Sequence, residues 1–144
     1  MEELMRMIEL QRQGLYCSQI LVSMGLQDQD KDNPDLVRAV QALAGGIGFS
    51  QDTCGALTGG ACLLGLYAGT GPREVDDPRL IQMVQALVDW FREEVGQQYG
   101  DTTCKAIVEG NFNNAPSRCP GIVAKTYQKA RELLAENGFM EPEL

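Results

Sequence analysis

The chain has 144 residues, of which 44% are hydrophobic, and this size and composition predict a single domain over residues 1–144. A net charge of −8, with scattered basic residues, argues against nucleic-acid binding, which depends on clustered Lys and Arg. The absence of histidine excludes Cys–His and Ser–His catalysis and every zinc site that uses a histidine ligand. Cysteines, carboxylates or a cofactor must therefore supply any chemistry.

The chain begins with MEELMRMIEL, which lacks the basic-then-apolar order of a signal peptide. No apolar run approaches the roughly 20 residues that cross a bilayer, so we expect no membrane insertion. These features predict a cytoplasmic protein and leave its oligomeric state open. Five cysteines, an odd number, favour redox or metal chemistry over a permanent disulfide framework in such a chain.

Apolar residues recur at helical spacing along nearly the whole chain. Residues 2–12 predict one helix, and Gly14 either separates it from a second helix that begins at Cys17 or lies within one long helix. The segment Asn-Pro-Asp at 33–35 is a typical helix start. That helix should end near Ala44, before a pair of glycines.

Three further segments have helical spacing. The middle of the stretch 50–69 predicts a helix, although each interior glycine in it costs about 1 kcal/mol relative to alanine. Amphipathic helices are expected over 78–96 and 120–137, the second ending at an Asn-Gly pair. No segment alternates with the period of a strand. The sequence therefore predicts an all-α, compact, bundle-like domain of five to seven helices.

Four of the five cysteines are expected at helix starts. Ser50 can cap the helix that contains Cys54, and Asp101 can cap the helix that contains Cys104. Cys119 directly precedes Pro120, a residue suited to the first helical position. We expect the four thiols to converge on one site: Cys17, Cys54, Cys104 and Cys119.

A helix start presents unpaired N–H groups and the positive end of the helix dipole, which lower the pKa of a thiol. We therefore expect Cys54 to be the most acidic or most strongly ligating thiol. Cys62 lies mid-helix in an apolar stretch, so it should pack as a small hydrophobe and be dispensable. Glycines beside Cys54 favour either close approach of a backbone or cofactor, or tight helix packing. The first interpretation predicts that Gly55→Val damages the site more than the fold.

The stretch DTCGALTGG, residues 52–60, resembles the Cys-Gly-Ala-x-x-Gly motif of the C_GCAxxG_C_C family of putative redox-active proteins. The preceding GGIGF is also similar to that family. The resemblance implies a redox role for one early cysteine, the motif cysteine and two later ones, which here are Cys17, Cys54, Cys104 and Cys119. A similar cysteine set in split-Soret cytochromes implies an iron–sulfur cluster as a candidate cofactor. Their haem-attaching Cys-x-x-Cys-His is absent here, so no haem is implied.

Three functions fit these observations. The first is dithiol/disulfide electron exchange with a protein partner, which needs no cofactor. The second is binding of an iron–sulfur cluster by the same four cysteines, with zinc ranked lower because structural zinc ligands usually occur in close pairs. The third is a non-redox helical adaptor whose cysteines only pack. Whether the protein is an enzyme is left open.

Overall fold

The computed structural model describes residues 2–142, and helices dominate this range. Seven α-helices have five residues or more, within the expected range, and a short turn of helix, α6, follows the fifth. The all-α prediction is confirmed, and the described residues contain no strand. The bounds are α1 Glu2–Arg12, α2 Cys17–Asp28, α3 Pro34–Val40, α4 Gly55–Ala68, α5 Pro78–Phe91, α6 Gln97–Tyr99, α7 Cys104–Val108 and α8 Ala115–Glu136.

The helix boundaries near the N-terminus follow local signals in the sequence. Gly14 has a φ of +91°, which ends α1 and confirms the interpretation with two separate helices. Asn33 caps α3, because its side chain accepts a hydrogen bond from the backbone N–H of Leu36 at 3.2 Å. A 3₁₀ turn at Gln41–Leu43 then extends α3 close to its predicted end.

The last helix begins earlier than the sequence predicts. It starts at Ala115, so Pro116 takes the position near the helix start that we had assigned to Pro120. The N–H group that proline lacks is one that a helix start leaves unpaired in any case. Pro120 then lies inside α8, and Cys119 lies beyond the first turn instead of at the cap. The predicted end is confirmed, since Asn137 is the C-cap.

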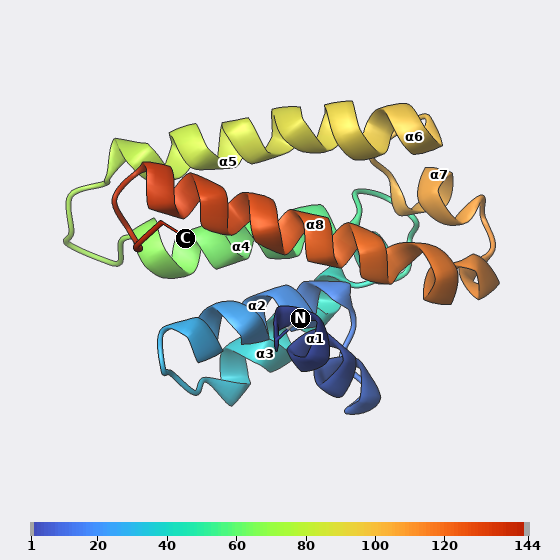
Figure 1. Ribbon diagram of the computed structural model, residues 1–144, viewed down its shortest axis with the longest axis horizontal. Coiled ribbons are helices and arrows are strands. Elements are labelled where there is room, and N and C mark those ends of the chain that lie inside the picture. The colour runs from blue at the N-terminus through green and yellow to red at the C-terminus, as the bar shows by residue number, and fades with distance from the viewer. Residues whose placement is uncertain (1, 143–144) are drawn as a thin grey trace.

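Helix α4 lies at the centre of the packing and contacts α2, α5 and α8 (Figure 1). A Cβ atom at Gly59 would lie 2.8 Å from the Cα of Ser18 in α2, and one at Gly60 would lie 2.8 Å from the Cγ2 of Thr126 in α8. These glycines therefore allow two helices to approach α4 closely. Among the described residues, no helix is long and apolar enough to cross a membrane.

A polar cluster joins α1, α2 and α8. The hydroxyl of Tyr127, a fully buried residue, donates to Asp28 at 2.6 Å and accepts from Arg6 at 2.8 Å and Arg131 at 2.9 Å. Both guanidinium groups also lie near the tyrosine ring, 5.7 and 5.5 Å from its centroid. Burial and the Asp28 carboxylate raise the pKa of Tyr127 to about 12, so the hydroxyl keeps its proton at neutral pH.

Replacing Tyr127 by phenylalanine should lower the free energy of unfolding by about 1–3 kcal/mol, because Asp28 and the two arginines lose a shared buried partner. Urea unfolding followed by circular dichroism measures the change. Tyr99→Phe is the matched control, since the Tyr99 hydroxyl makes no hydrogen bond among the described residues. Equal stabilities for the two variants would contradict a stabilising role for the cluster.

Candidate functional site: a cysteine-lined pocket

A short backbone pairing holds the start of α4 against the start of α7. Thr53 and Thr103 form an antiparallel bridge. The N–H of Cys54 donates to the carbonyl oxygen of the residue before Thr103 at 3.0 Å. The N–H of Cys104 donates in turn to the carbonyl oxygen of the residue before Thr53 at 2.7 Å. The bridge therefore places two cysteines that are distant in sequence beside each other.

The loop between α3 and this bridge has an unusual backbone. Six of its residues have positive φ, and three of them are not glycine: Ile47, Phe49 and Gln51. A non-glycine residue in this region is strained and is held there only by surrounding structure. A Cβ atom at Gly46 would lie 2.5 Å from the backbone of Asp52 and 2.8 Å from the Cβ of Cys104. Only glycine allows the loop to press against the bridge in this way.

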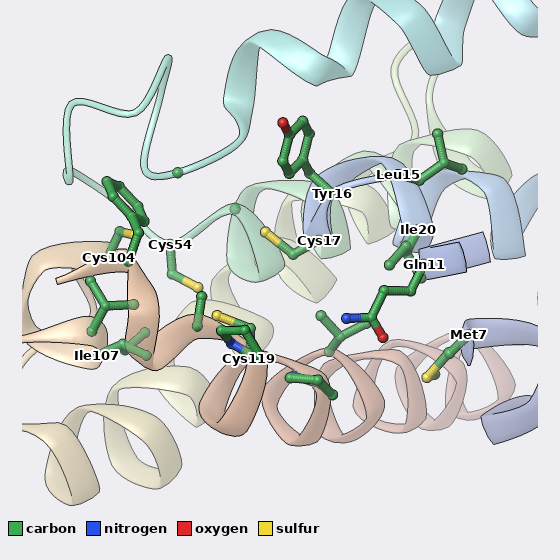
Figure 2. Close-up of a pocket in the computed structure, with 18 of the residues that line it drawn as sticks. Met7, Gln11, Leu15, Tyr16, Cys17, Ile20, Cys54, Cys104, Ile107 and Cys119 are labelled. Atoms are coloured by element: carbon green, nitrogen blue, oxygen red, sulfur yellow. The ribbon is translucent and has the colours of Figure 1, made fainter. Parts of the chain in front are cut away.

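The four predicted cysteines all line one pocket of about 450 Å³. Figure 2 shows the sulfurs of Cys17, Cys54 and Cys119 turned toward one another, with Cys104 further along the same pocket. All are free thiols. Cys62 does not line this pocket; it packs against a smaller apolar cluster formed by Val22, Leu26 and Val40.

Gly55, the first residue of α4, makes room for Cys17. A Cβ atom at this position would lie 2.6 Å from the Sγ of Cys17 and 3.2 Å from the carbonyl oxygen of Leu43. The glycines of α4 therefore have both of the roles that the sequence allowed, which are close approach at the site and tight helix packing. Gly55 admits a sulfur to the site, whereas Gly59 and Gly60 admit neighbouring helices.

The capping groups differ from those predicted. Cys54 itself occupies the N-cap position of α4, and no side chain, including that of Ser50, caps this helix. Thr103 caps α7 instead of Asp101, because its side-chain oxygen accepts from the N–H of Ala106 at 3.1 Å. The Thr53–Thr103 bridge fixes where α7 begins and so places Thr103 at the cap position.

The prediction that Cys54 is the most acidic thiol is wrong. Burial, reinforced by charge on Cys17, raises the pKa of the Cys54 thiol to about 12, although the backbone N–H groups of Ala56 and Leu57 act in the opposite direction. Burial likewise raises the pKa of the Cys119 thiol to about 11. Removing a thiolate from water costs more free energy than hydrogen bonds from a few backbone N–H groups regain. Desolvation therefore raises the pKa by more than the helix start lowers it.

After burial, charge on Cys17 is a further cause of the raised pKa of each of the other three thiols of the pocket. Charge on Cys17 raises the pKa of Cys54, Cys104 and Cys119, so the four groups cannot all ionise together at low cost. Burial raises the pKa of Cys17 as well, while hydrogen bonds from backbone N–H groups, including that of Gly45, lower it. Among the described residues, no three cysteine, aspartate or glutamate side chains form a group that could hold a metal ion.

Sequence reasoning missed two parts of the pocket. Three aromatic side chains surround it near the cysteines, with ring centroids 5.3 Å apart for Tyr16 and Phe49 and 5.4 Å apart for Phe49 and Phe112. The other part is a face of α1 that includes Leu4 and Ile8, both about half exposed. Their spacing of four residues, apart from the buried Met7 and Leu10, was the available signal that α1 has a second apolar face.

The fold and the site define a small all-α protein with four cysteines around an apolar pocket. Residues 15–133 match the family described as "Putative redox-active protein (C_GCAxxG_C_C)". The chain therefore belongs to the C_GCAxxG_C_C family, which confirms the resemblance found in the sequence. No curated protein and no solved structure matches the chain.

Gly55→Ala should disturb the site more than the fold, and Gly65→Ala is its matched control in the same helix. The methyl group at 55 would displace the Cys17 sulfur, whereas nothing lies within 4 Å of a Cβ at 65. We expect faster alkylation of Cys17 in Gly55→Ala, measured by mass spectrometry of the reduced protein. Gly65→Ala should leave that rate unchanged and gain up to about 1 kcal/mol of stability. An unchanged alkylation rate in Gly55→Ala would refute the close-approach interpretation.

The raised thiol pKa values predict a loss of stability in alkali. Below pH 9 the thiols are protonated in both states; above it they ionise in the unfolded chain first, since the folded values for Cys54 and Cys119 are about 12 and about 11. Each thiol should therefore lower the unfolding free energy by about 1.4 kcal/mol per pH unit while only the unfolded form is ionised. Urea unfolding of the reduced protein between pH 8 and 10.5 measures this slope.

The double variant Cys54→Ala/Cys119→Ala is the comparison for that experiment. Its stability should depend less steeply on pH than that of the unmodified chain over the same range. Parallel curves for the two proteins would show that burial does not hold these thiols in their protonated form.

Proposed function

We propose that the protein exchanges two electrons through dithiol/disulfide chemistry at Cys17, Cys54, Cys104 and Cys119. The observation that carries the proposal is the shared pocket, which gathers these four thiols from distant parts of the chain. Oxidation of two thiols to one disulfide releases two protons and two electrons. This half-reaction needs no base beyond the thiols and no histidine, which the chain lacks.

Cys17 and Cys54 are the pair that the contacts favour. The Sγ of Cys17 lies against Gly55, the residue directly after Cys54, and charge on Cys17 raises the pKa of Cys54. Cys104 and Cys119 are left as the second pair, since both line the same pocket; after burial and charge on Cys17, charge on Cys104 also raises the pKa of Cys119. Two pairs in one pocket can pass a disulfide between them by thiol–disulfide exchange.

Exposure suggests the order of events with a protein partner. Cys17 is partly exposed, whereas Cys54 is buried. The Cys17 thiolate attacks a disulfide of the partner and forms a mixed disulfide, and one partner sulfur leaves and takes up a proton. Cys54 then loses its proton, attacks the Cys17 sulfur and displaces the second partner sulfur. The partner has gained two electrons, and Cys17 and Cys54 form a disulfide.

The backbone assists the first step of this sequence. A thiolate at Cys17 accepts hydrogen bonds from backbone N–H groups, among them those of Ser18 and Gly45. Gly45 belongs to the loop with positive φ values, which aims its N–H at the sulfur. The strained loop therefore supports the charged form of the thiol to which we assign the first attack.

An iron–sulfur cluster is the second candidate, supported by the donor set of four cysteines without histidine around one pocket. When bound, such a cluster would supply one-electron transfer in place of dithiol exchange. A single metal ion such as zinc is less well supported, because no three potential ligands among the described side chains form a group that could hold one. A protein redox partner and a cytoplasmic location remain part of this proposal.

Counting free thiols separates the candidate functions. Protein purified without oxygen should be colourless, and mild oxidation should remove two or four thiols that a reductant restores. Cys17→Ser and Cys54→Ser should each abolish the fastest disulfide, while Cys62→Ser, the matched control outside the pocket, should behave like the unmodified chain. Brown colour with visible absorbance would favour the cluster. A colourless, metal-free protein with a constant thiol count would leave the adaptor function.

A further inference from the structure

The pocket extends well beyond the cysteines. At its far end it is lined by α1 through Leu4, Met7, Ile8 and Gln11. Helix α1 lies outside residues 15–133, the part of the chain that matches the family. One end of the pocket thus carries the family's cysteines, and the other end is formed by a helix outside the matched part. Its volume of about 450 Å³ is that of a site for a small organic molecule.

Among the described residues, no charged side chain lines this pocket, although the chain contains 20 acidic and 12 basic residues. Apart from the cysteines, its lining is apolar except for Gln11 and the ring-bearing Tyr16 (Figure 2). A phosphate, carboxylate or other ion would lose its hydration here without gaining a countercharge. The lining therefore selects an uncharged occupant with a large apolar surface.

The chemistry of the cysteines narrows the class of ligand further. When a dithiol becomes a disulfide, two protons and two electrons leave together, and neither form of the protein needs to carry charge. A quinone takes up two electrons and two protons to become a hydroquinone, so it too is uncharged before and after the transfer. We propose that this pocket binds a lipophilic quinone-type compound, with its ring at the cysteines and its apolar substituents along α1.

Named side chains suit each part of such a ligand. The rings of Tyr16, Phe49 and Phe112 surround the cysteine end and offer aromatic faces and edges to a planar ring. Leu4 and Ile8, which are half exposed and therefore free to be covered, match the apolar substituents. The redox part of this inference rests on the proposed dithiol function, whereas the binding part does not.

Two dyes with the same aromatic skeleton test the binding part. N-Phenyl-1-naphthylamine is uncharged, and 8-anilino-1-naphthalenesulfonate adds one negative charge. We expect the uncharged dye to bind at least about tenfold more tightly, since no described residue of the lining supplies a countercharge. Ile8→Glu should weaken binding of the uncharged dye at least about tenfold, whereas the same change at Ile81, also an exposed isoleucine but on α5 outside the pocket, should not. Circular dichroism checks that both variants fold.

Duroquinone tests the redox part, because methyl groups at every free ring position remove the hydrogens that thiols would substitute. Under anaerobic conditions, the reduced protein should lose two thiols for each hydroquinone formed. Ile8→Glu should slow this reaction at least about tenfold and leave oxidation by hydrogen peroxide unchanged, and Ile81→Glu should affect neither.

The outcomes separate the inference from the proposed function. Equal affinity for the two dyes, or equal effects of Ile8→Glu and Ile81→Glu, would overturn the binding site. Disulfide formation with peroxide but not with duroquinone would overturn the quinone assignment and leave the dithiol function standing. Selective binding of the uncharged dye without thiol loss to any oxidant would overturn the dithiol function, and with it the reduction of the quinone.

Discussion

The antiparallel pairing of Thr53 with Thr103 is the constraint on which the pocket depends. It uses the N–H groups of Cys54 and Cys104, which are bonded across the bridge to backbone carbonyls. It also fixes the starts of α4 and α7 side by side, and the loop containing Gly46 folds over it. These backbone hydrogen bonds hold the two cysteines at one pocket.

Close packing around α4 serves both the fold and the pocket. Gly59 and Gly60 allow α2 and α8 to pack closely against this helix. The packing of α2 places the Cys17 sulfur in the space that Gly55 leaves open. The cost of several glycines in one helix is therefore offset by burial of the helices that they admit. The same packing places Cys119, in the first part of α8, in the lining of the pocket.

Burial of the cysteines gives the pocket its chemical character. The thiols stay protonated at neutral pH, because desolvation raises the pKa of each one. Such thiols react slowly with reagents in solution, so a bound partner that excludes water and supplies a reacting atom gains a kinetic advantage. Protonated thiols and, among the described lining residues, the lack of any charged side chain give the pocket an uncharged character.

The sequence by itself determined the features that depend on neighbouring residues. Helical spacing, the Asn33 cap and the stop at Asn137 all act within a few residues, and the cysteine motif identified the family. Tertiary structure alone decided the rest. The pKa of Cys54 rises because distant helices remove its water, and Ile8 lines the pocket because α1 packs near α8. Desolvation and contact between remote segments depend on residues from many parts of the chain, so no local sequence pattern predicts them.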